Sequence, residues 1–237
     1  MATMNGLKLF GFQYLCCLVL VIWVQHGVAY ERGDIVARAG IALIDGQDDV
    51  GSATLAGAEL GEFGVRSVTL PIANVSYFFS DHFAVEMLVG KPPTFEIYGT
   101  SGAIEDSPIG TVEAFPLVVY ANYYPMRAQS RWQPHVGLGL NYVISGDSSV
   151  DPELESRFGA DSVDITGIDN SLGLVVALGL DYMLTPNVML AVDAYYLDVK
   201  AEAQIEVLIN DQIYAAQLSG RTGRAPILYA LTLGYRF

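Results

Sequence analysis

The chain is poor in basic residues, and this shortage narrows its possible partners. Only 12 lysines and arginines stand against 26 aspartates and glutamates, which gives the 237 residues a formal net charge of −14 at pH 7. A protein that binds nucleic acid needs clustered cations to neutralise the phosphate backbone. The charge balance therefore argues against nucleic acid as a partner.

Long hydrophobic runs are also missing after residue 29, although the chain is rich in apolar residues. Hydrophobic residues make up 52% of the chain, charged residues only 16%, and the mean hydropathy is +0.36. The longest later run of apolar residues and glycine, Leu172 to Leu180, has nine residues, whereas a membrane-spanning helix needs about 20. A tilted β-strand crosses a bilayer in about 9–11 residues. The composition therefore favours membrane strands over membrane helices.

Cysteine is absent beyond the first 29 residues. Cys16 and Cys17 both lie in an apolar stretch from Leu9 to Val24, which is followed by the small residues Gly27 to Ala29. This pattern is typical of a secretory signal peptide, and the alternative, an uncleaved anchor helix, would need a longer apolar core. We predict that residues 1–29 are a cleaved signal peptide and that residues 30–237 form one domain. An exported domain without disulfides needs another source of stability, which closure of a barrel would supply.

Apolar residues alternate with small or polar residues in three later segments. The clearest segment presents the apolar series Leu172, Leu174, Val176, Leu178, Leu180, Tyr182 and Leu184. Residues 136–144 and 227–237 alternate in the same way. A helical face would need a period of 3.6 residues, whereas a barrel strand in lipid has a period of two. These segments therefore predict strands with one face in lipid and one face in a lumen.

Extending this pattern gives eight strands. We place them near residues 34–44, 66–79, 83–90, 110–124, 131–145, 169–184, 188–200 and 224–237. The sequence thus predicts an all-β protein, an eight-stranded antiparallel transmembrane β-barrel. Side chains nearly fill the interior of a barrel of this size, which excludes a wide aqueous pore.

The connectors between these strands alternate strictly between short and long. The long ones are residues 45–65, 91–109, 146–168 and 201–223. Long loops of bacterial barrels face outside and short turns face the periplasm, so we expect these four segments outside the cell. The third contains the signals of a short helix, with Asp151 as N-cap, Pro152 at the first helical position and Gly159 as a stop.

Several segments together resemble a known family. They are Val36 to Gly40, Tyr77 to Glu86 across the first short turn, Pro134 to Tyr142, Gly179 to Tyr182, Tyr195 to Val199, and Gly234 to Phe237. In order and spacing they resemble the OmpW family of small outer-membrane barrels, which includes the AlkL-type proteins. The resemblance covers the strands of residues 30–237 and is weak in the loops. It implies a location in the bacterial outer membrane and a channel for small apolar molecules, without naming the ligand.

Five charged side chains should point into the barrel by strand parity. They are Arg38, Glu86, Asp181, Asp193 and Arg236. Burying charges in a narrow lumen is costly unless they pair, and here two cations meet three anions. Two interpretations stay open: a polar plug that closes the lower barrel, or structural ion pairing with no part in transport.

The inward positions above this plug are mostly apolar. They are Ala42, Ile44, Ile72, Leu88, Val118, Tyr120, Val175, Tyr195, Leu197 and Leu228. They could line a pocket for an apolar ligand, or a small barrel could simply fill its own interior. The residues alone favour the second interpretation, and the family resemblance favours the first.

A solute above a closed plug would have to leave through the barrel wall. Proline removes a hydrogen-bond donor from a strand ladder. Pro71, Pro116 and Pro226 fall within or at the upper ends of predicted strands, so we expect a lateral exit beside one of them, Pro71 first. The alternative is that these prolines only mark β-bulges.

The last strand presents an outward apolar face through Leu233, Tyr235 and Phe237. This face is similar to the family's assembly signal, so we expect it to direct insertion. The expected partners are outer-membrane lipid and lipopolysaccharide, the barrel-assembly machinery and a small hydrophobic ligand.

Enzymatic chemistry has little support in the sequence. His82 and His135, the two histidines beyond residue 29, fall at predicted periplasmic strand ends, away from the outer leaflet. No nucleophile motif, paired carboxylates or metal-ligand spacing stands out, so we predict no enzyme, cofactor or metal. Two functions remain: a channel for small hydrophobic compounds, or a structural or receptor barrel without transport. A continuous apolar cavity above the plug would separate them.

Overall fold

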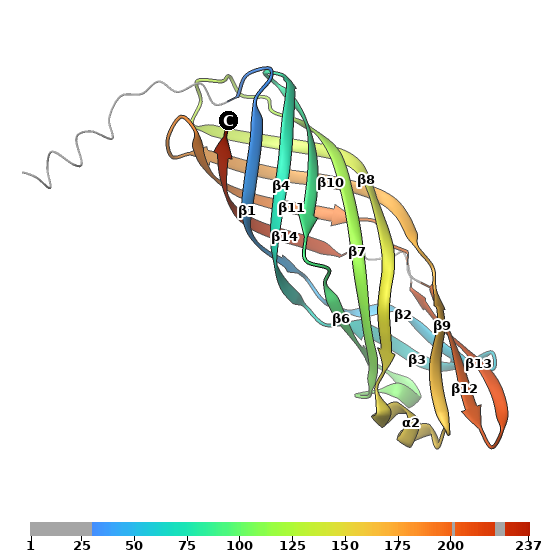
Figure 1. Cartoon of the computed structure of the whole chain (residues 1–237). Helices are drawn as coiled ribbons and strands as arrows, with labels where there is room; N and C mark the ends of the chain where they lie inside the picture. Colours follow the sequence, from blue (N-terminus) through green and yellow to red (C-terminus); the bar gives the residue numbers. More distant parts are fainter. Residues whose placement is uncertain (1–29, 201, 221–225) are drawn as a thin grey trace, which may run out of the picture.

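The computed structural model describes residues 30–200, 202–220 and 226–237, and it folds into a barrel that continues at one end into an extension (Figure 1). The predicted signal peptide, residues 1–29, lies outside the described residues. Among the residues described, no helix is both long enough and apolar enough to cross a membrane.

Eight strands close the barrel. They are β1 (Ile35–Ile44), β4 (Val68–Ser80), β5 (Phe83–Gly90), β7 (Pro108–Tyr123), β8 (Trp132–Val150), β10 (Ser171–Met183), β11 (Val188–Leu197) and β14 (Ile227–Arg236). Each pairs antiparallel with the next, and the pairing of β1 with β14 joins the two ends of the series. The predicted fold class, an eight-stranded antiparallel barrel, is confirmed.

Tight turns join these strands at the end of the barrel where the C-terminus lies, which we call the turn end (Figure 1). The Ser80 hydroxyl accepts a hydrogen bond from the backbone nitrogen of Phe83, 3.1 Å away. At another turn, the Thr185 hydroxyl accepts from the backbone nitrogens of Asn187 and Val188, at 3.3 and 3.0 Å. Short side chains of this kind replace the ladder partners that a turn lacks.

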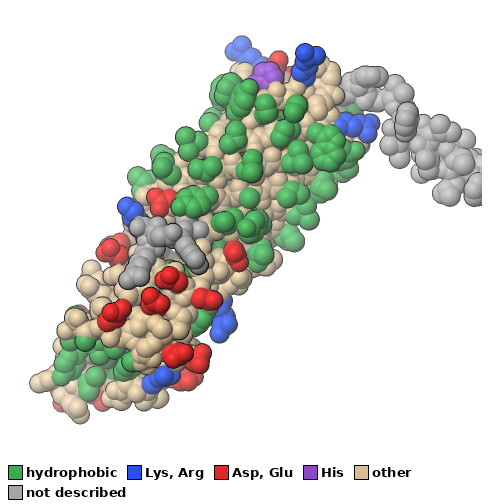
Figure 2. Space-filling model, turned by 180° about the vertical axis from the view of Figure 1, so that it is seen from behind, with side chains coloured by type: hydrophobic (Ala, Val, Ile, Leu, Met, Phe, Trp, Pro, Cys, Tyr) green, Lys and Arg blue, Asp and Glu red, His purple; other side chains and the backbone are tan. Residues whose placement is uncertain are grey.

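The predicted alternation sets which side chains face the lumen. In β10, Val175 is fully buried, while its neighbours Leu174 and Val176 are exposed. Figure 2 shows hydrophobic side chains over the outer surface of the barrel, with charged side chains at the turn end and over the extension. A barrel with apolar groups on its outer face and closed strand pairing satisfies the requirements of a bilayer.

The long connectors contain strands, which corrects the expectation that they are loops. Their position outside the cell stays a prediction. They form a second set of strands: β2 (Gln47–Leu55), β3 (Ala58–Val65), β6 (Thr94–Gly99), β9 (Ser162–Ile168), β12 (Glu202–Ile209) and β13 (Gln212–Gly220). Two of the connectors are hairpins with tight turns at Ala56-Gly57 and Asn210-Asp211, where all four residues have a positive φ. Such turns match the twist of paired strands, so the connectors fold as hairpins.

The extension continues the wall of the barrel. β7 and β8 run through both parts, and the sheet order there is β8-β7-β6-β3-β2-β13-β12-β9. The short helices η1 (Gly102–Ile104) and α2 (Pro152–Phe158) lie at its far end (Figure 1). α2 confirms the predicted helix, because the Asp151 side chain accepts a hydrogen bond from the backbone of Glu153 and Gly159 ends the helix at φ 60°.

Candidate functional site

A cavity of about 250 Å³ lies where the barrel meets the extension, and we call it the lumen cavity. Six of the ten predicted pocket residues line it: Ile44, Ile72, Leu88, Val118, Leu197 and Leu228. Ala42, Val175, Tyr120 and Tyr195 are buried in the same apolar cluster. All ten side chains are buried at the inward positions that strand parity predicts, and their role as a ligand pocket stays a prediction. The extension contributes further apolar walls, such as Phe63 and Ile97.

Tyr120 and Tyr195 form the lower boundary of this apolar region. Their rings meet edge to face, with centroids 5.7 Å apart. The Tyr120 hydroxyl donates to the Glu86 carboxylate and lies 3.1 Å from the Tyr195 hydroxyl. The Tyr195 hydroxyl accepts a hydrogen bond from the Asn74 side chain at 3.2 Å. Both residues therefore have apolar rings in the upper cluster and hydroxyls in a polar layer below.

Arg38 is the centre of this polar layer. One terminal nitrogen, Nη1, lies 3.0 Å from the Glu86 carboxylate and 2.8 Å from the Ser76 hydroxyl. The other, Nη2, lies 2.7 Å from the Asp181 carboxylate and 3.2 Å from the Tyr124 hydroxyl. The side chains of the three ionised residues are at most 2% exposed. One cation thus bridges two carboxylates across the lumen, and this pairing, with further hydrogen bonds, offsets part of the cost of burying the charges.

Glu86 is surrounded by donors from three strands. Besides Arg38, its carboxylate accepts from Asn74 at 2.6 Å, Ser76 at 2.7 Å and Asn122 at 3.2 Å. These polar residues were missed in the sequence, although Asn74 and Ser76 have the same inward parity as Ile72. Parity could have found them, since a polar side chain at an inward position must find a buried partner.

Tyr30 closes this layer from the turn end, and no sequence pattern pointed to it. It is 1% exposed, and its ring stacks on Phe78 with centroids 4.3 Å apart. Its hydroxyl donates to the Asp181 carboxylate. The segment that follows is fixed by Gly33, which has φ 100° and whose backbone nitrogen donates to the Phe78 carbonyl at 2.7 Å.

We call the whole layer the polar floor. It consists of Tyr30, Arg38, Asn74, Ser76, Glu86, Asn122, Tyr124 and Asp181. Asp193 was predicted in the same group but pairs with His135, whose Nε2 lies 3.0 Å from its carboxylate.

Arg236 differs from the prediction that it joins the plug. It pairs with Asp34 at 3.3 Å, and its side chain is 15% exposed. It is the last residue of β14, where a long side chain can lie along the rim of the barrel instead of entering the lumen. The polar layer therefore contains fewer ionised side chains than predicted and more neutral side chains that form hydrogen bonds.

The strand pairing of β5 ends beside the lumen cavity. Pairing between β4 and β5 ends at Ile72 and Gly90, and pairing between β5 and β7 ends at Leu88 and Val118. Above these pairs the chain continues as Lys91-Pro92-Pro93, in which the two prolines have no backbone N–H to donate. Gly90, Lys91 and Pro93 line the cavity on this side.

The three predicted exit prolines have different positions relative to the end of this pairing. Pro71 adjoins the last β4–β5 pair and is exposed on the outer face. Pro116 and Pro226 line the lumen cavity itself. Of the three, Pro71 is therefore the one next to the end of the β4–β5 pairing, and the lateral exit stays a prediction.

Charged side chains surround the upper part of the cavity, where the strands leave the barrel. Arg66 pairs with Glu96 at 3.4 Å, and its guanidinium lies over the Tyr98 ring, 4.7 Å from the centroid. The Tyr98 hydroxyl donates to Asp48, and this hydrogen bond raises the pKa of Tyr98 above its ordinary value. Arg66 lines the cavity itself, as do the charged residues Asp45, Lys91, Asp169 and Lys200, so the apolar interior has a polar rim.

A closed antiparallel barrel with an apolar outer face and a narrow, partly apolar lumen defines a small outer-membrane β-barrel protein. The model of the OmpW family matches residues 31–237. The chain therefore belongs to the OmpW family, and it is an outer-membrane protein.

Relatives agree with this assignment over most of their length. Outer membrane protein W of Vibrio cholerae is 27% identical over 228 residues, which cover 95% of this chain and 99% of that protein. Outer membrane protein W of Escherichia coli is 26% identical over 209 residues, covering 88% of this chain and 91% of the relative. Outer membrane protein AlkL of Ectopseudomonas oleovorans is 23% identical, covering 73% and 71%.

Solved structures show the same fold. The crystal structure of OprG from Pseudomonas aeruginosa superposes with a TM-score of 0.75 at 25% identity, covering 90% of this chain and 99% of that chain. The solid-state NMR structure of AlkL in DMPC bilayers gives a TM-score of 0.62 at 20% identity, covering 91% and 95%. This chain and these two solved structures therefore have the same overall fold.

Proposed function

We propose that the protein is a narrow hydrophobic channel that takes small apolar molecules from outside the cell into the outer membrane. The observation that carries this proposal is the lumen cavity, because its apolar lining lies directly above the polar floor. An apolar solute gains free energy by leaving water for such a lining, by roughly 25 cal/mol for each Å² buried. The cavity thus favours the solutes that lipopolysaccharide, with its charged sugar layer, excludes.

The polar floor prevents a direct passage to the turn end. Arg38 alone contacts two carboxylates and three hydroxyl groups there. An apolar solute would have to break these contacts and leave charged groups unpaired, which is strongly unfavourable in a buried site. The floor therefore acts as the closed base of the route, and we infer that the predicted polar plug has this role.

The route then turns sideways into the bilayer. We place the opening next to Pro71, just beyond the last β4–β5 pair. There the chain continues from β5 as the Lys91-Pro92-Pro93 segment. Widening the opening breaks few ladder bonds, since the prolines donate none. An apolar molecule is more stable in lipid than in the aqueous periplasm. Lateral release is thus downhill for the ligand class that the lining selects.

The remaining partners follow from the orientation in the membrane. We propose that the extension, with its acidic surface, stands outside the cell among the sugars of lipopolysaccharide. Leu233, Tyr235 and Phe237 are between 47% and 71% exposed on the outer face at the end of the last strand, in reach of the barrel-assembly machinery.

Deleting Phe237 is expected to leave protein that is exported but poorly inserted. Normal heat-modifiable barrel formation by the deletion variant would contradict a role of these residues in insertion.

A charge in the lining tests the transport function. Ile72→Asp or Leu228→Asp is expected to slow the uptake of a hydrophobic fluorescent dye by intact cells, because an ionised group in the cavity repels apolar solutes. Ile72→Leu is the matched control, since it keeps an apolar side chain at the same position. Barrel assembly is checked by heat-modifiable migration on gels. Unchanged uptake by assembled Asp variants would remove the channel and favour the alternative, a structural or receptor barrel.

A further inference from the structure

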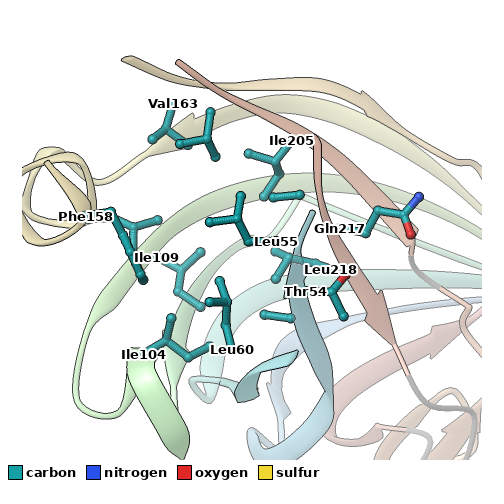
Figure 3. Close-up of a pocket in the computed structure, with 14 residues that line it drawn as sticks. Thr54, Leu55, Leu60, Ile104, Ile109, Phe158, Val163, Ile205, Gln217 and Leu218 are labelled. Atoms are coloured by element: carbon teal, nitrogen blue, oxygen red, sulfur yellow. The ribbon is translucent and has the colours of Figure 1, made fainter. Parts of the chain in front are cut away.

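A second cavity lies inside the extension, and we call it the extension chamber. Its volume is about 40 Å³, and residues from β2, β3, β7, β9, β12, β13 and both short helices line it. Figure 3 shows Ile104, Ile109 and Phe158 on one side and Val163 and Ile205 on another, with their side chains directed into the same space. The chamber is part of an apolar core separate from the one in the barrel.

The chamber has few groups that could form hydrogen bonds with a water molecule. Thr54 and Gln217 are its only polar lining residues among those described, and Figure 3 shows the Gln217 amide directed away from the group. Ladder pairing engages the backbone of the surrounding hairpins, as between β12 and β13 and between β13 and β2. A buried water needs two to four polar partners, and apolar cavities without them stay dry. A dry apolar cavity binds apolar atoms or molecules that fit it.

Leu218 of β13 lines both this chamber and the lumen cavity, and it is 7% exposed. Phe63 and Ala53 belong to the same apolar cluster as Leu218, and Phe63 also lines the lumen cavity. The two cavities are therefore neighbours that share Leu218 as a lining residue.

We propose that the extension chamber is a second binding site for small apolar molecules, placed before the lumen cavity and next to it at Leu218. Its role as an entry station rests on the proposed channel function; its capacity to bind does not. A cavity of about 150 Å³ holds benzene. The smaller chamber takes a gas atom, a short hydrocarbon, or the methyl end of a longer chain, so the ligand class is narrower than that of the lumen cavity.

Substitutions at three alanines test whether the chamber binds a ligand. Ala216 of β13 is buried and lines it, while the adjacent Ala215 is exposed on the outer face. Ala216→Leu therefore fills the chamber, and Ala215→Leu adds the same atoms outside it. Ala53→Val, from β2, fills the same space from another strand and serves if Ala216→Leu does not fold.

Xenon is a suitable probe, because it is apolar and binds dry cavities. In crystals of the full barrel under xenon pressure, we expect one xenon site in the extension chamber and another in the lumen cavity. Ala216→Leu or Ala53→Val should abolish the first site and keep the second, whereas Ala215→Leu should keep both. Xenon in the lumen cavity alone, xenon at neither place, or an extension site that survives both filling variants would overturn the proposal.

This result is independent of the proposed function. If the chamber binds no xenon while Ile72→Asp slows dye uptake, the channel stands and the second site falls. If the chamber binds xenon while Ile72→Asp leaves uptake unchanged, the site stands and its role in transport falls.

Discussion

The lower half of the lumen and the lumen cavity above it follow one another along the same barrel and have opposite chemistry, and strands of the extension add to the wall of the cavity. Below, Arg38, Glu86 and Asp181 are joined across the barrel by ion pairs and hydrogen bonds. Above, Ile72, Val118 and their neighbours leave a cavity of about 250 Å³. The difference teaches how a narrow barrel can be closed at one end and open at the other. Polar groups must find partners and so draw together, whereas apolar groups impose no such demand.

The largest effect is expected when the lower half loses its cation. Arg38→Met leaves Glu86 and Asp181 buried without their partner, which should cost about 3–5 kcal/mol of unfolding free energy. Urea unfolding in detergent micelles measures it. The triple variant Arg38→Met, Glu86→Gln, Asp181→Asn removes all three charges together. It should recover most of the lost unfolding free energy. A single variant as stable as the wild type would show that the floor is not held by charge.

The aromatic cover of the floor should have the next largest effect. Tyr30→Ala removes a buried ring that stacks on Phe78, at a cost of about 3 kcal/mol, and uncovers the turn end of the lumen. We expect small-ion conductance in planar bilayers to rise. Tyr30→Phe keeps the stacked ring and should cost only about 1 kcal/mol for the lost hydroxyl. Equal conductance in wild type and Tyr30→Ala would place the barrier elsewhere in the floor.

Larger side chains should distinguish the packing of the two halves, with smaller effects on the unfolding free energy than the two changes above. Ala84 is fully buried beside Phe78 and Tyr124 in the lower half, so Ala84→Leu should overpack it and cost about 1–3 kcal/mol. Ala114 lines the lumen cavity, so Ala114→Leu should change stability by less than about 1 kcal/mol and slow dye uptake. Similar unfolding free energies for both variants would mean that the upper half is packed as tightly as the lower.

The sequence was sufficient for the barrel because its residues repeat a period of two. Leu174 and Val175 were assigned to opposite faces from that pattern alone, and the structure places them so. Their assignment needed no knowledge of neighbouring strands. The inward positions of Ile72 and Leu228 followed from the same rule.

The rest depends on contacts between strands that no local pattern encodes. The partner of Asp193 is His135 on another strand, and that choice follows from the register between strands. Tyr30 lies before the first strand, where parity has no meaning. The extension was missed because its hairpins turn at Ala56-Gly57 and Asn210-Asp211 inside acidic segments that resemble loops.

The central claim is that apolar molecules enter from above and leave sideways next to Pro71, and a reversible staple tests it most directly. Pro71 and Lys91 each lie one residue beyond the last β4–β5 pair, Ile72 with Gly90. Opposed residues within an antiparallel ladder lie about 4.5–5.5 Å apart between Cα atoms, which is within disulfide range. A disulfide one residue beyond the last pair would therefore extend the ladder geometry and hold the Lys91 segment against β4. The chain has no cysteine after Cys17, so Pro71→Cys with Lys91→Cys introduces a single pair of thiols.

The measurement is dye uptake by cells that carry this double variant, oxidised and then reduced. We predict slow uptake with the disulfide formed and recovery to the rate of the Pro71→Cys single variant after reduction. Equal uptake in both states, with disulfide formation verified on gels, would contradict the lateral route.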